Sequence, residues 1–504
     1  MQQYATAVEV PEITRPARWW SRRRPPPLLL ILLAQAGLSL RLVWSNTAFA
    51  DEALYLWAGR LEWSHWLHGT ALPGYAFPVY FSGAPVVYPP IGALANAVGG
   101  LAGARMLSLC FMLGTTALLY SVACRLFGRR TAVIAAAVFA FLGVTQNLGA
   151  FATYDAMAVL LLALAAWFAI RSGGRWGELA LIACALVLVL ADATKYASLL
   201  WNPVVVALAV FGMPGVWWKA ILRGVRLVVY GVAMALPLLF LAGGRPYVTG
   251  LMYTTLSRQL PGTTPPHTVL SYAFNWIGIV FILALLGFIL SLSAGDKRIS
   301  WLCGILTAAV LLAPLNQARI DTLTSLQKHV DFGAWFGAIA VGYGLSRVAD
   351  IYGARPRRLL AVTVIAVLWL GIPQASTLFT FWPNSSGMIR ELSVALNRSK
   401  CPCLIAESNG ASYYLPRQMG ATVPVDSYGF TYYDNSTRHE VSGPSAYTLA
   451  IKAGYFGVIE MDDAEGSPDF TSVTHILASA RNYTLLATIP ASNQRNPFRI
   501  WTRK

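Results

Sequence analysis

Residues 45–57 read SNTAFADEALYLW, and this stretch decides between two architectures for the chain. Its first half ends in Ala48-Phe-Ala50, the small-residue pattern at which a signal peptidase cuts, after an arginine-rich start and an apolar run. Its second half opens with two adjacent carboxylates, Asp51 and Glu52. Asp51 is therefore either the first residue of a secreted protein or an acid at the mouth of a membrane protein.

The composition identifies the solvent in which most of the chain folds. Hydrophobic residues make up 56% of the 504 residues and charged residues only 12%, and the mean hydropathy is +0.54. A soluble globular protein carries about 25% charged residues. Apolar runs long enough to span a bilayer recur from Leu28 to Gln374. The sequence thus predicts a polytopic α-helical membrane protein with about eleven transmembrane helices.

The basic residues predict the orientation of these helices. The formal net charge is +16, and Lys and Arg gather in alternate gaps between the apolar runs, for example at 22–24, 125–130 and 355–358. Cytoplasmic loops carry an excess of Lys and Arg, so we expect the N-terminus in the cytoplasm. Charge spread over alternate gaps also disfavours nucleic acid as a partner, because it follows the topology of the helices.

This orientation divides the chain into three parts. Residues 1–27 form a cytoplasmic N-terminal segment, residues 28–376 a transmembrane domain, and residues 377–504 an extracytoplasmic α/β domain in which strand-like and helical runs alternate. The outer loops hold nearly all of the polar side chains that suggest a function. The main outer loops are 45–104, 243–268 and 316–331.

Cleavage after Ala50 conflicts with the rest of the chain. The basic region is long for a signal peptide, and Arg41 and Trp44 interrupt the approach to the cut. An inserted first helix is also needed to set the orientation that every later basic cluster follows. Asp51 then lies just outside this helix, and the amphipathic run at 53–67 is expected to lie along the membrane surface. A simple helix-capping role for the acids is the alternative, because carboxylates favour the first turn of a helix.

Further charges lie at the outer ends of the predicted helices. Charged side chains at membrane depth are costly and usually mark a function. Carboxylates and separated cations on one side of a bilayer suit an anionic lipid substrate, whose phosphate is bound while a neighbouring group is deprotonated. The charges beside Asp51 and Glu52 are Arg41, Asp155, Lys195, Arg258, His267, Lys328 and His329.

The order of these motifs resembles the GT-C membrane glycosyltransferases, in particular protein O-mannosyltransferases and lipid A aminoarabinose transferases. The resemblance covers roughly residues 28–344 and implies the GT-C fold. It implies an inverting glycosyltransferase that moves a sugar from a polyprenyl-phosphate donor to a cell-envelope glycan, lipid or protein outside the cytoplasmic membrane. The motifs that carry it are Asp51-Glu52, Tyr88-Pro89-Pro90, Gly103-Ala-Arg105-Met-Leu-Ser108, Arg125-Leu-Phe127-Gly-Arg-Arg130, Thr153-Tyr-Asp155 and Ala193-Thr-Lys195.

The resemblance implies roles for the acids. Asp51 is the candidate base that removes the proton from the acceptor hydroxyl, because an alcohol that attacks an anomeric carbon must lose its proton. Glu52 would orient the site, and Asp155 would be a second acid for acceptor or sugar hydroxyls. These three residues are the predicted catalytic set.

The resemblance also implies cations for the departing phosphate, which gains charge as the bond breaks. Lys195 matches a family lysine, and Lys328 and His329 occupy a late outer loop where the family has basic residues. Arg41, Arg258 and His267 complete the predicted phosphate-binding set.

Two positions depart from the aminoarabinose transferases. That family has an arginine where this chain has Leu54 and a lysine where it has Tyr88, and both contact phosphate there. Phosphate binding must therefore be rearranged in this chain. The identity of the donor sugar does not carry over from the family.

Two other functions stay open at this point: a transporter or flippase of a lipid-linked sugar, and a non-catalytic assembly protein. Transporters tend to place ionisable residues in mid-helix and to contain repeated halves. This chain keeps its acids at outer helix ends and has no repeat. No His and Asp residues have the spacing of metal ligands, so no cofactor is certain and a divalent metal is an open alternative. The expected partners are the lipid-linked donor, the acceptor and membrane lipid.

A topological test follows from the charge pattern. A reporter fused after Ile372 should read as extracytoplasmic, and reporters fused at Arg130 or Arg298 should read as cytoplasmic, because Lys and Arg gather around the last two positions. Paired alkaline phosphatase and fluorescent protein fusions measure the side. A cytoplasmic signal after Ile372 would contradict both the predicted helix number and the side on which the acids lie.

Overall fold

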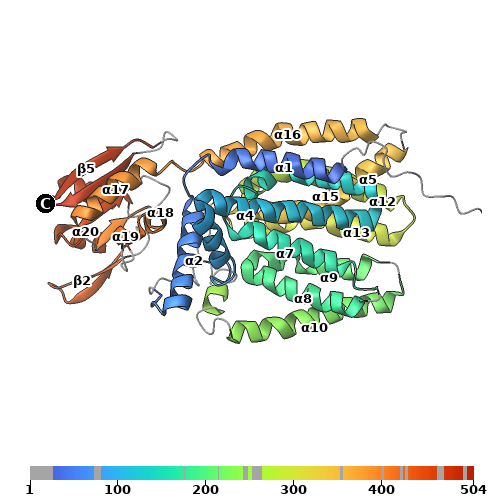
Figure 1. The fold of residues 1–504 in the computed structure, drawn as a ribbon, viewed down its shortest axis with the longest axis horizontal. Helices are drawn as coiled ribbons and strands as arrows, with labels where there is room; N and C mark the ends of the chain where they lie inside the picture. The colour runs from blue at the N-terminus through green and yellow to red at the C-terminus, as the bar shows by residue number, and fades with distance from the viewer. Residues whose placement is uncertain are drawn as a thin grey trace, which may run out of the picture.

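The computed structural model describes residues 26–504, with gaps at 73–80, 175, 214, 242–247, 253–263, 352–355, 400–401, 420–423, 426–429, 462–469 and 492–496. Long helices lie side by side in one bundle, and a smaller domain with a β-sheet lies beyond one end of it (Figure 1). The predicted class, a helical membrane protein with a C-terminal α/β domain, is confirmed.

Each predicted apolar segment falls on one helix or on a broken pair of helices. The helices of the bundle are α1 (Pro27–Val43), α4 (Tyr88–Phe127), α5 (Arg129–Phe141), α6 (Gly143–Leu148), α7 (Tyr154–Ala169), α8 (Gly177–Thr194), α9 (Asn202–Phe211), α10 (Trp217–Leu241), α12 (Pro266–Leu292), α13 (Lys297–Ala308), α14 (Leu312–Arg319), α15 (Leu326–Ile351) and α16 (Pro356–Thr380). Within the described residues, 6 helices are long and apolar enough to cross a membrane. The total number of crossings stays a prediction.

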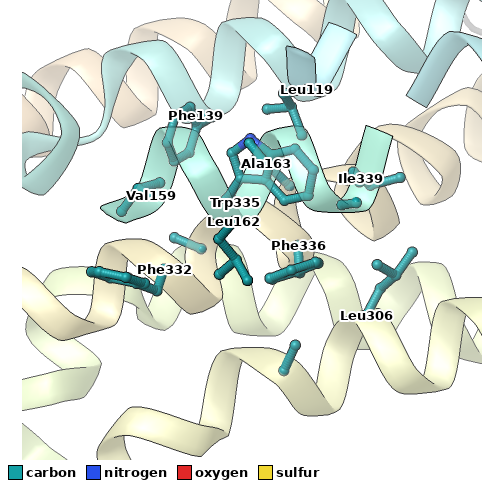
Figure 2. Packing of buried hydrophobic residues seen from close by; sticks show 14 of the residues in the cluster. Leu119, Phe139, Val159, Leu162, Ala163, Leu306, Phe332, Trp335, Phe336 and Ile339 are labelled. Carbon is teal, nitrogen blue, oxygen red and sulfur yellow. The ribbon is translucent and has the colours of Figure 1, made fainter. Parts of the chain in front are cut away.

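Helix α15 is the central element of the bundle. Phe332, Trp335 and Phe336 of α15 are buried against neighbouring helices, including α7 at Leu162 and α13 at Leu306 (Figure 2). The indole nitrogen of Trp335 donates to the backbone oxygen of Thr115 at 3.1 Å, so this large side chain is buried without an unpaired polar atom. The packed core fixes α15 rigidly, and with it the polar residues at its start.

The predicted outer loop at 45–104 is largely helical. A helix is present at the expected place as α2 (Ala50–His68), which runs across the ends of the long helices (Figure 1). The expectation that it is amphipathic is wrong, because residues 52–59 are all buried, so no polar face is turned to solvent there. The next helix was expected to begin near Arg105, but α4 begins at Tyr88 and breaks at Gly99 and Gly100. Gly100 has a φ of 60°, a backbone conformation that glycine adopts at little cost. The break lets the first part of α4 pack against α2 before the helix enters the bundle.

A close approach joins α2 to α4. A Cβ atom built at Gly59 would lie 1.9 Å from the backbone oxygen of Pro89. Nearby, the indole nitrogen of Trp63 donates to the backbone oxygen of Pro90 at 2.9 Å. The Tyr88-Pro89-Pro90 motif is therefore the surface on which α2 rests.

The predicted loop at 316–331 ends earlier than expected. Helix α15 begins at Leu326, whereas the sequence pattern suggested a start near Phe332. Lys328 and His329 consequently lie in the first turns of a helix. The hydropathy pattern missed this start because Lys328 and Asp331 are polar, yet both are buried and have partners in the fold.

The C-terminal domain is built around a four-stranded sheet of order β1-β4-β6-β5. Strand β4 pairs in parallel with β1 and antiparallel with β6. The strand-like runs expected in this domain are present as strands, and α16 continues to Thr380, past the predicted boundary at residue 376. The elements are α17 (Ser386–Arg398), β1 (Cys403–Ile405), α18 (Ser408–Tyr414), α19 (Pro416–Met419), β2 (Thr431–Asp434), β3 (His439–Ser442), α20 (Pro444–Lys452), β4 (Val458–Met461), α21 (Phe470–Ser479), β5 (Tyr483–Ile489) and β6 (Phe498–Arg503).

The contact between α2 and α4 gives a stability test. Gly59→Ala should destabilise the protein by about 1–3 kcal/mol, the usual cost of overpacking, because its new methyl group would overlap the Pro89 carbonyl. The matched control is Gly37→Ala in α1, where a Cβ would meet nothing within 4 Å. Thermal unfolding in detergent measures both variants. Equal melting temperatures for the two would contradict the close approach.

Candidate functional site

A buried ion pair between Glu52 and Arg105 organises the end of the bundle that faces the C-terminal domain (Figure 1). Both side chains have 0% exposure. The guanidinium binds both carboxylate oxygens, with Nε to Oε1 at 2.8 Å and Nη2 to Oε2 at 2.7 Å. Such a fork-to-fork pair fixes orientation as well as distance. The pair therefore holds α2 against α4 in one geometry.

The remaining hydrogen-bonding capacity of the pair holds two backbone segments. Glu52 accepts from the backbone N–H of Phe49 at 3.0 Å and of Ala152 at 2.8 Å. Arg105 donates to the backbone oxygens of Val43, Asn46 and Thr47. The turn between α1 and α2 and the segment before α7 are thus tied to one buried group. Asp51 comes two residues after Phe49 in the first segment, and Asp155 comes three residues after Ala152 in the second.

Two further ion pairs form beside these two backbone segments. Asp51 Oδ2 accepts from Lys328 Nζ of α15 at 2.6 Å, and Asp155 of α7 pairs with Lys195, which follows α8. Lys328 also interacts electrostatically with Asp155, so the two pairs behave as one group. We call Asp51, Lys328, Asp155 and Lys195 the four-charge cluster.

The members of the four-charge cluster differ in access to solvent. The side chains of Asp155 and Lys195 are 0% and 2% exposed, and that of Lys328 is 6% exposed. Asp51 is 31% exposed. Asp51 is therefore the carboxylate that an incoming molecule reaches first, and the other three charges form a fixed, buried background.

Aromatic rings wall the cluster. The rings of Tyr55 and Tyr154 lie 4.4 Å apart, Lys195 Nζ lies 5.0 Å from the centre of the Tyr154 ring, and Lys328 Nζ lies 5.8 Å from that of Phe151. Burial, reinforced by the Asp51 carboxylate, raises the pKa of the Tyr55 hydroxyl well above its ordinary value. Tyr55 is thus a neutral hydroxyl at physiological pH. The apolar walls strengthen every charge interaction inside them.

A second backbone contact positions Lys195. Ala84 donates its N–H to the Ala193 oxygen at 2.6 Å, and Tyr196 donates to the Ser82 oxygen at 2.7 Å. Between these bonds, a Cβ atom at Gly83 would lie 2.0 Å from the backbone oxygen of Thr194. Only glycine permits this approach, which holds the chain extended at Lys195 and directs it away from the path of α8.

The C-terminal domain contributes to the walls of the site through α18. Tyr413 belongs to the same buried cluster as Tyr55 and Tyr154, and its hydroxyl donates to Asn96 Oδ1 at 2.6 Å. Arg60 Nη2 of α2 donates to the Tyr413 backbone oxygen at 2.7 Å, and its guanidinium carbon lies 5.1 Å from the centre of the Tyr413 ring. The domain is therefore fastened to the helix that carries Asp51.

The other predicted phosphate-binding residues lie outside the four-charge cluster. Arg41 donates to Ser376, to Gln146 and to the backbone oxygen of Ile372, and so joins α1 to α6 and α16. His329 contacts Gln317 through Nδ1 at 2.8 Å and interacts electrostatically with Asp155. His267 is exposed at the start of α12, and Arg258 lies outside the described residues.

Sequence analysis did not assign site roles to Tyr55 and Tyr413, nor to the two arginines Arg60 and Arg105. Tyr55 is four residues after Asp51, a spacing that puts both on one face of a helix, so a signal was available for it. Tyr413 and Arg60 gave no signal because they meet only in the folded chain. Across the described residues, no group of three or more His, Cys, Asp or Glu side chains could hold a metal ion.

No protein-family model matches the sequence, and no curated protein matches it. Solved structures do match. ArnT from Cupriavidus metallidurans, known in the apo state and bound to undecaprenyl phosphate, has a TM-score of 0.58 and 14% identity over 94% of this chain and 97% of its own. The oligosaccharyltransferase AglB from Archaeoglobus fulgidus, in complex with an inhibitory peptide and a dolichol-phosphate, has a TM-score of 0.55 and 12% identity over 86% of this chain and 69% of its own.

A third match is the arabinofuranosyltransferase AftD from Mycobacteria, with a TM-score of 0.54 and 15% identity over 94% of this chain. This chain spans 40% of the length of AftD. At such identities the likeness shows the fold. The chain has the fold of the GT-C membrane glycosyltransferases, and the resemblance predicted from its motifs is confirmed at that level.

The Glu52–Arg105 pair gives a second stability test. Glu52→Gln leaves the Arg105 guanidinium buried without a counter-charge, which costs about 3–5 kcal/mol when a buried pair is broken. The control is Asp350→Asn, which breaks an ion pair with Arg130 whose side chains are both 50% exposed, and such pairs contribute about 0–1 kcal/mol. Thermal unfolding in detergent measures the difference. Similar small shifts for both variants would refute the organising role of Glu52.

Proposed function

We propose that this chain is an inverting glycosyltransferase that moves a sugar from a polyprenyl-phosphate donor to the hydroxyl group of an acceptor. The observation that carries the proposal is the pairing of a partly exposed carboxylate, Asp51, with a buried cation, Lys328, at the start of helix α2. The GT-C fold supports it, since ArnT has been seen with undecaprenyl phosphate and AglB with a dolichol-phosphate.

The proposed reaction begins at Asp51. The acceptor oxygen attacks the anomeric carbon of the donor from the face opposite the phosphate, and Asp51 takes the hydroxyl proton as the new C–O bond forms. The bond between the anomeric carbon and the phosphate oxygen breaks with its electron pair on that oxygen. Configuration at the anomeric carbon is thereby inverted, and polyprenyl phosphate leaves with one more negative charge.

Lys328 and Lys195 would stabilise that charge. Fixed cations aimed at a developing negative charge lower the barrier most strongly where water is excluded, and both ammonium groups are buried. In the chain without substrate, Lys328 is neutralised by Asp51. A donor phosphate would compete for Lys328 and release Asp51, so donor binding would itself prepare the base. Asp155 would keep Lys195 charged and in place.

This arrangement explains how phosphate could be bound although Leu54 and Tyr88 replace two cations of the aminoarabinose transferases. Leu54 and Tyr88 are both buried, and the ring of Tyr88 lies edge-on to that of Tyr55 at 6.4 Å. Neither supplies a cation at the positions where that family has one. We therefore assign phosphate binding to cations from the other side of the site, with Lys328 as the principal contact and His329 as an additional one. Glu52 has a positioning role.

Asp51→Asn tests the proposed base. The amide keeps the size of the side chain but cannot take up a proton, so transfer should fall by about 10²–10⁴-fold. Binding of undecaprenyl phosphate should be unchanged or tighter, because the variant leaves Lys328 without its counter-ion. The product is identified by mass spectrometry as the envelope glycan or lipid that disappears in a deletion strain, and binding is measured on the purified full chain.

Asp350→Asn, at the opposite end of the bundle, is the matched control and should restore the product as wild type does. Near-normal product formation by a well-folded Asp51→Asn variant would contradict the assignment, and would support a helix-capping role because Asn caps helices as well as Asp. The flippase alternative is tested with the purified full chain in detergent, where a transporter has nothing to transport. Failure to release polyprenyl phosphate from the lipid-linked sugar there would favour the flippase.

A further inference from the structure

A cavity of about 410 Å³ lies at the end of the bundle remote from Asp51. Helix α7 starts beside the four-charge cluster and α8 returns to it, so Ser172, Gly173 and Gly174 between them lie at the opposite end. The cavity is formed by these residues and by the first turns of α10. Its polar lining includes Glu178, Lys219, Arg223 and Arg226.

The lining carries excess positive charge. Arg226 Nη1 binds Glu178 Oε2 at 2.8 Å, and the Tyr230 hydroxyl donates to the same carboxylate. Among the residues that the structure describes, no acid pairs with Lys219 or Arg223. Three cations against one carboxylate leave a net charge of +2 on the lining (3 − 1 = 2).

Two guanidinium nitrogens in this lining are buried without an acceptor. Arg223 Nη2 and Arg226 Nε are both shielded from solvent and have no hydrogen-bond partner. The rest of the Arg223 side chain is fixed, because Nε donates to the Ala209 oxygen at 3.2 Å. A buried donor without an acceptor is costly, and more so on a charged group. Because these two nitrogens are shielded, an anion in the cavity would contact the other part of the Arg223 side chain, which lines it.

The surroundings place the cavity at the headgroup layer of a membrane. Trp217 and Trp218, at the start of α10, are each 60% exposed, and Trp176 in the neighbouring turn is 68% exposed. Tryptophan is enriched at this depth of a bilayer. Only 11% of the most apolar part of α10 is buried against the rest of the protein. A long apolar surface therefore leads from the cavity toward the membrane interior. Leu222 lines the cavity and is itself 44% exposed.

We propose that this cavity binds the phosphate of an anionic membrane lipid. Lys219 and Arg223 supply the charge, Arg223 supplies a fixed donor, and the exposed face of α10 receives the acyl chains. Basic pockets between membrane helices suit such headgroups. The paired Glu178 and Arg226 also line the cavity, and the Glu178 carboxylate limits the net charge of the lining. The site is separate from the proposed catalytic centre and does not depend on it.

The test measures phosphatidylglycerol binding to the purified full chain in detergent by native mass spectrometry, with phosphatidylcholine as the zwitterionic comparison. Lys219→Gln and Arg223→Gln should each weaken phosphatidylglycerol binding about fivefold, equivalent to ~1 kcal/mol per cation, and the double variant about 25-fold. The matched control is Arg129→Gln, because Arg129 is exposed at the same end of the bundle and does not line the cavity. It should bind as wild type does.

Three outcomes would overturn the proposal. Equal losses for Arg129→Gln and Arg223→Gln would mean that basic residues attract lipid diffusely. Displacement of the lipid by millimolar inorganic phosphate would assign the site to a free anion. Equal binding of phosphatidylglycerol and phosphatidylcholine would show that the positive lining does not select an anionic headgroup. Lys219 is exposed on α10, so Lys219→Gln should fold normally and decides the matter even if Arg223→Gln does not fold.

Discussion

The rest of the site depends on one buried ion pair, between Glu52 and Arg105. Breaking such a pair is costly because it leaves one charge buried and alone, and this pair also binds five backbone groups. Those groups belong to the turn before α2 and to the segment before α7. The same turn holds the link to the C-terminal domain, since Asn46 donates to backbone oxygens near Trp382 and Thr47 accepts from the Trp382 indole. One interaction thus positions both candidate acids and the C-terminal domain.

Much of the fold was predictable, because hydropathy and basic residues each carry a simple physical signal. The apolar runs, a helix after Asp51 and the C-terminal strands all appear where the pattern put them, although the helix after Asp51 is buried over residues 52–59 and is not amphipathic. The starts of α4 and α15 did not. Helix α4 begins at Tyr88, inside a predicted loop, and is broken at Gly99 and Gly100 before it enters the bundle. Helix α15 begins at Leu326 and includes Lys328, whose charge is paired with Asp51. Local patterns contain neither fact.

The candidate site was predictable in part for the same reason. Asp51, Asp155, Lys195 and Lys328 were identified as charges at outer helix ends, and the structure brings them together. Which acid pairs with which lysine depends on contacts across 40 and 277 positions of sequence. Arg41 was indistinguishable from them by sequence, yet its bonds join helices away from the cluster. The contribution of Tyr413 requires the docking of a separate domain, which composition does not encode.

The central claim is that the four-charge cluster receives a lipid phosphate and that this frees Asp51. The most direct measurement is an experimental structure of the full chain with undecaprenyl phosphate. The account predicts a phosphate oxygen within ~4 Å of Lys328 Nζ, the usual limit of an ion pair, with the bond between Lys328 and Asp51 lengthened or broken. A phosphate bound elsewhere, with both ion pairs of the cluster intact, would contradict it.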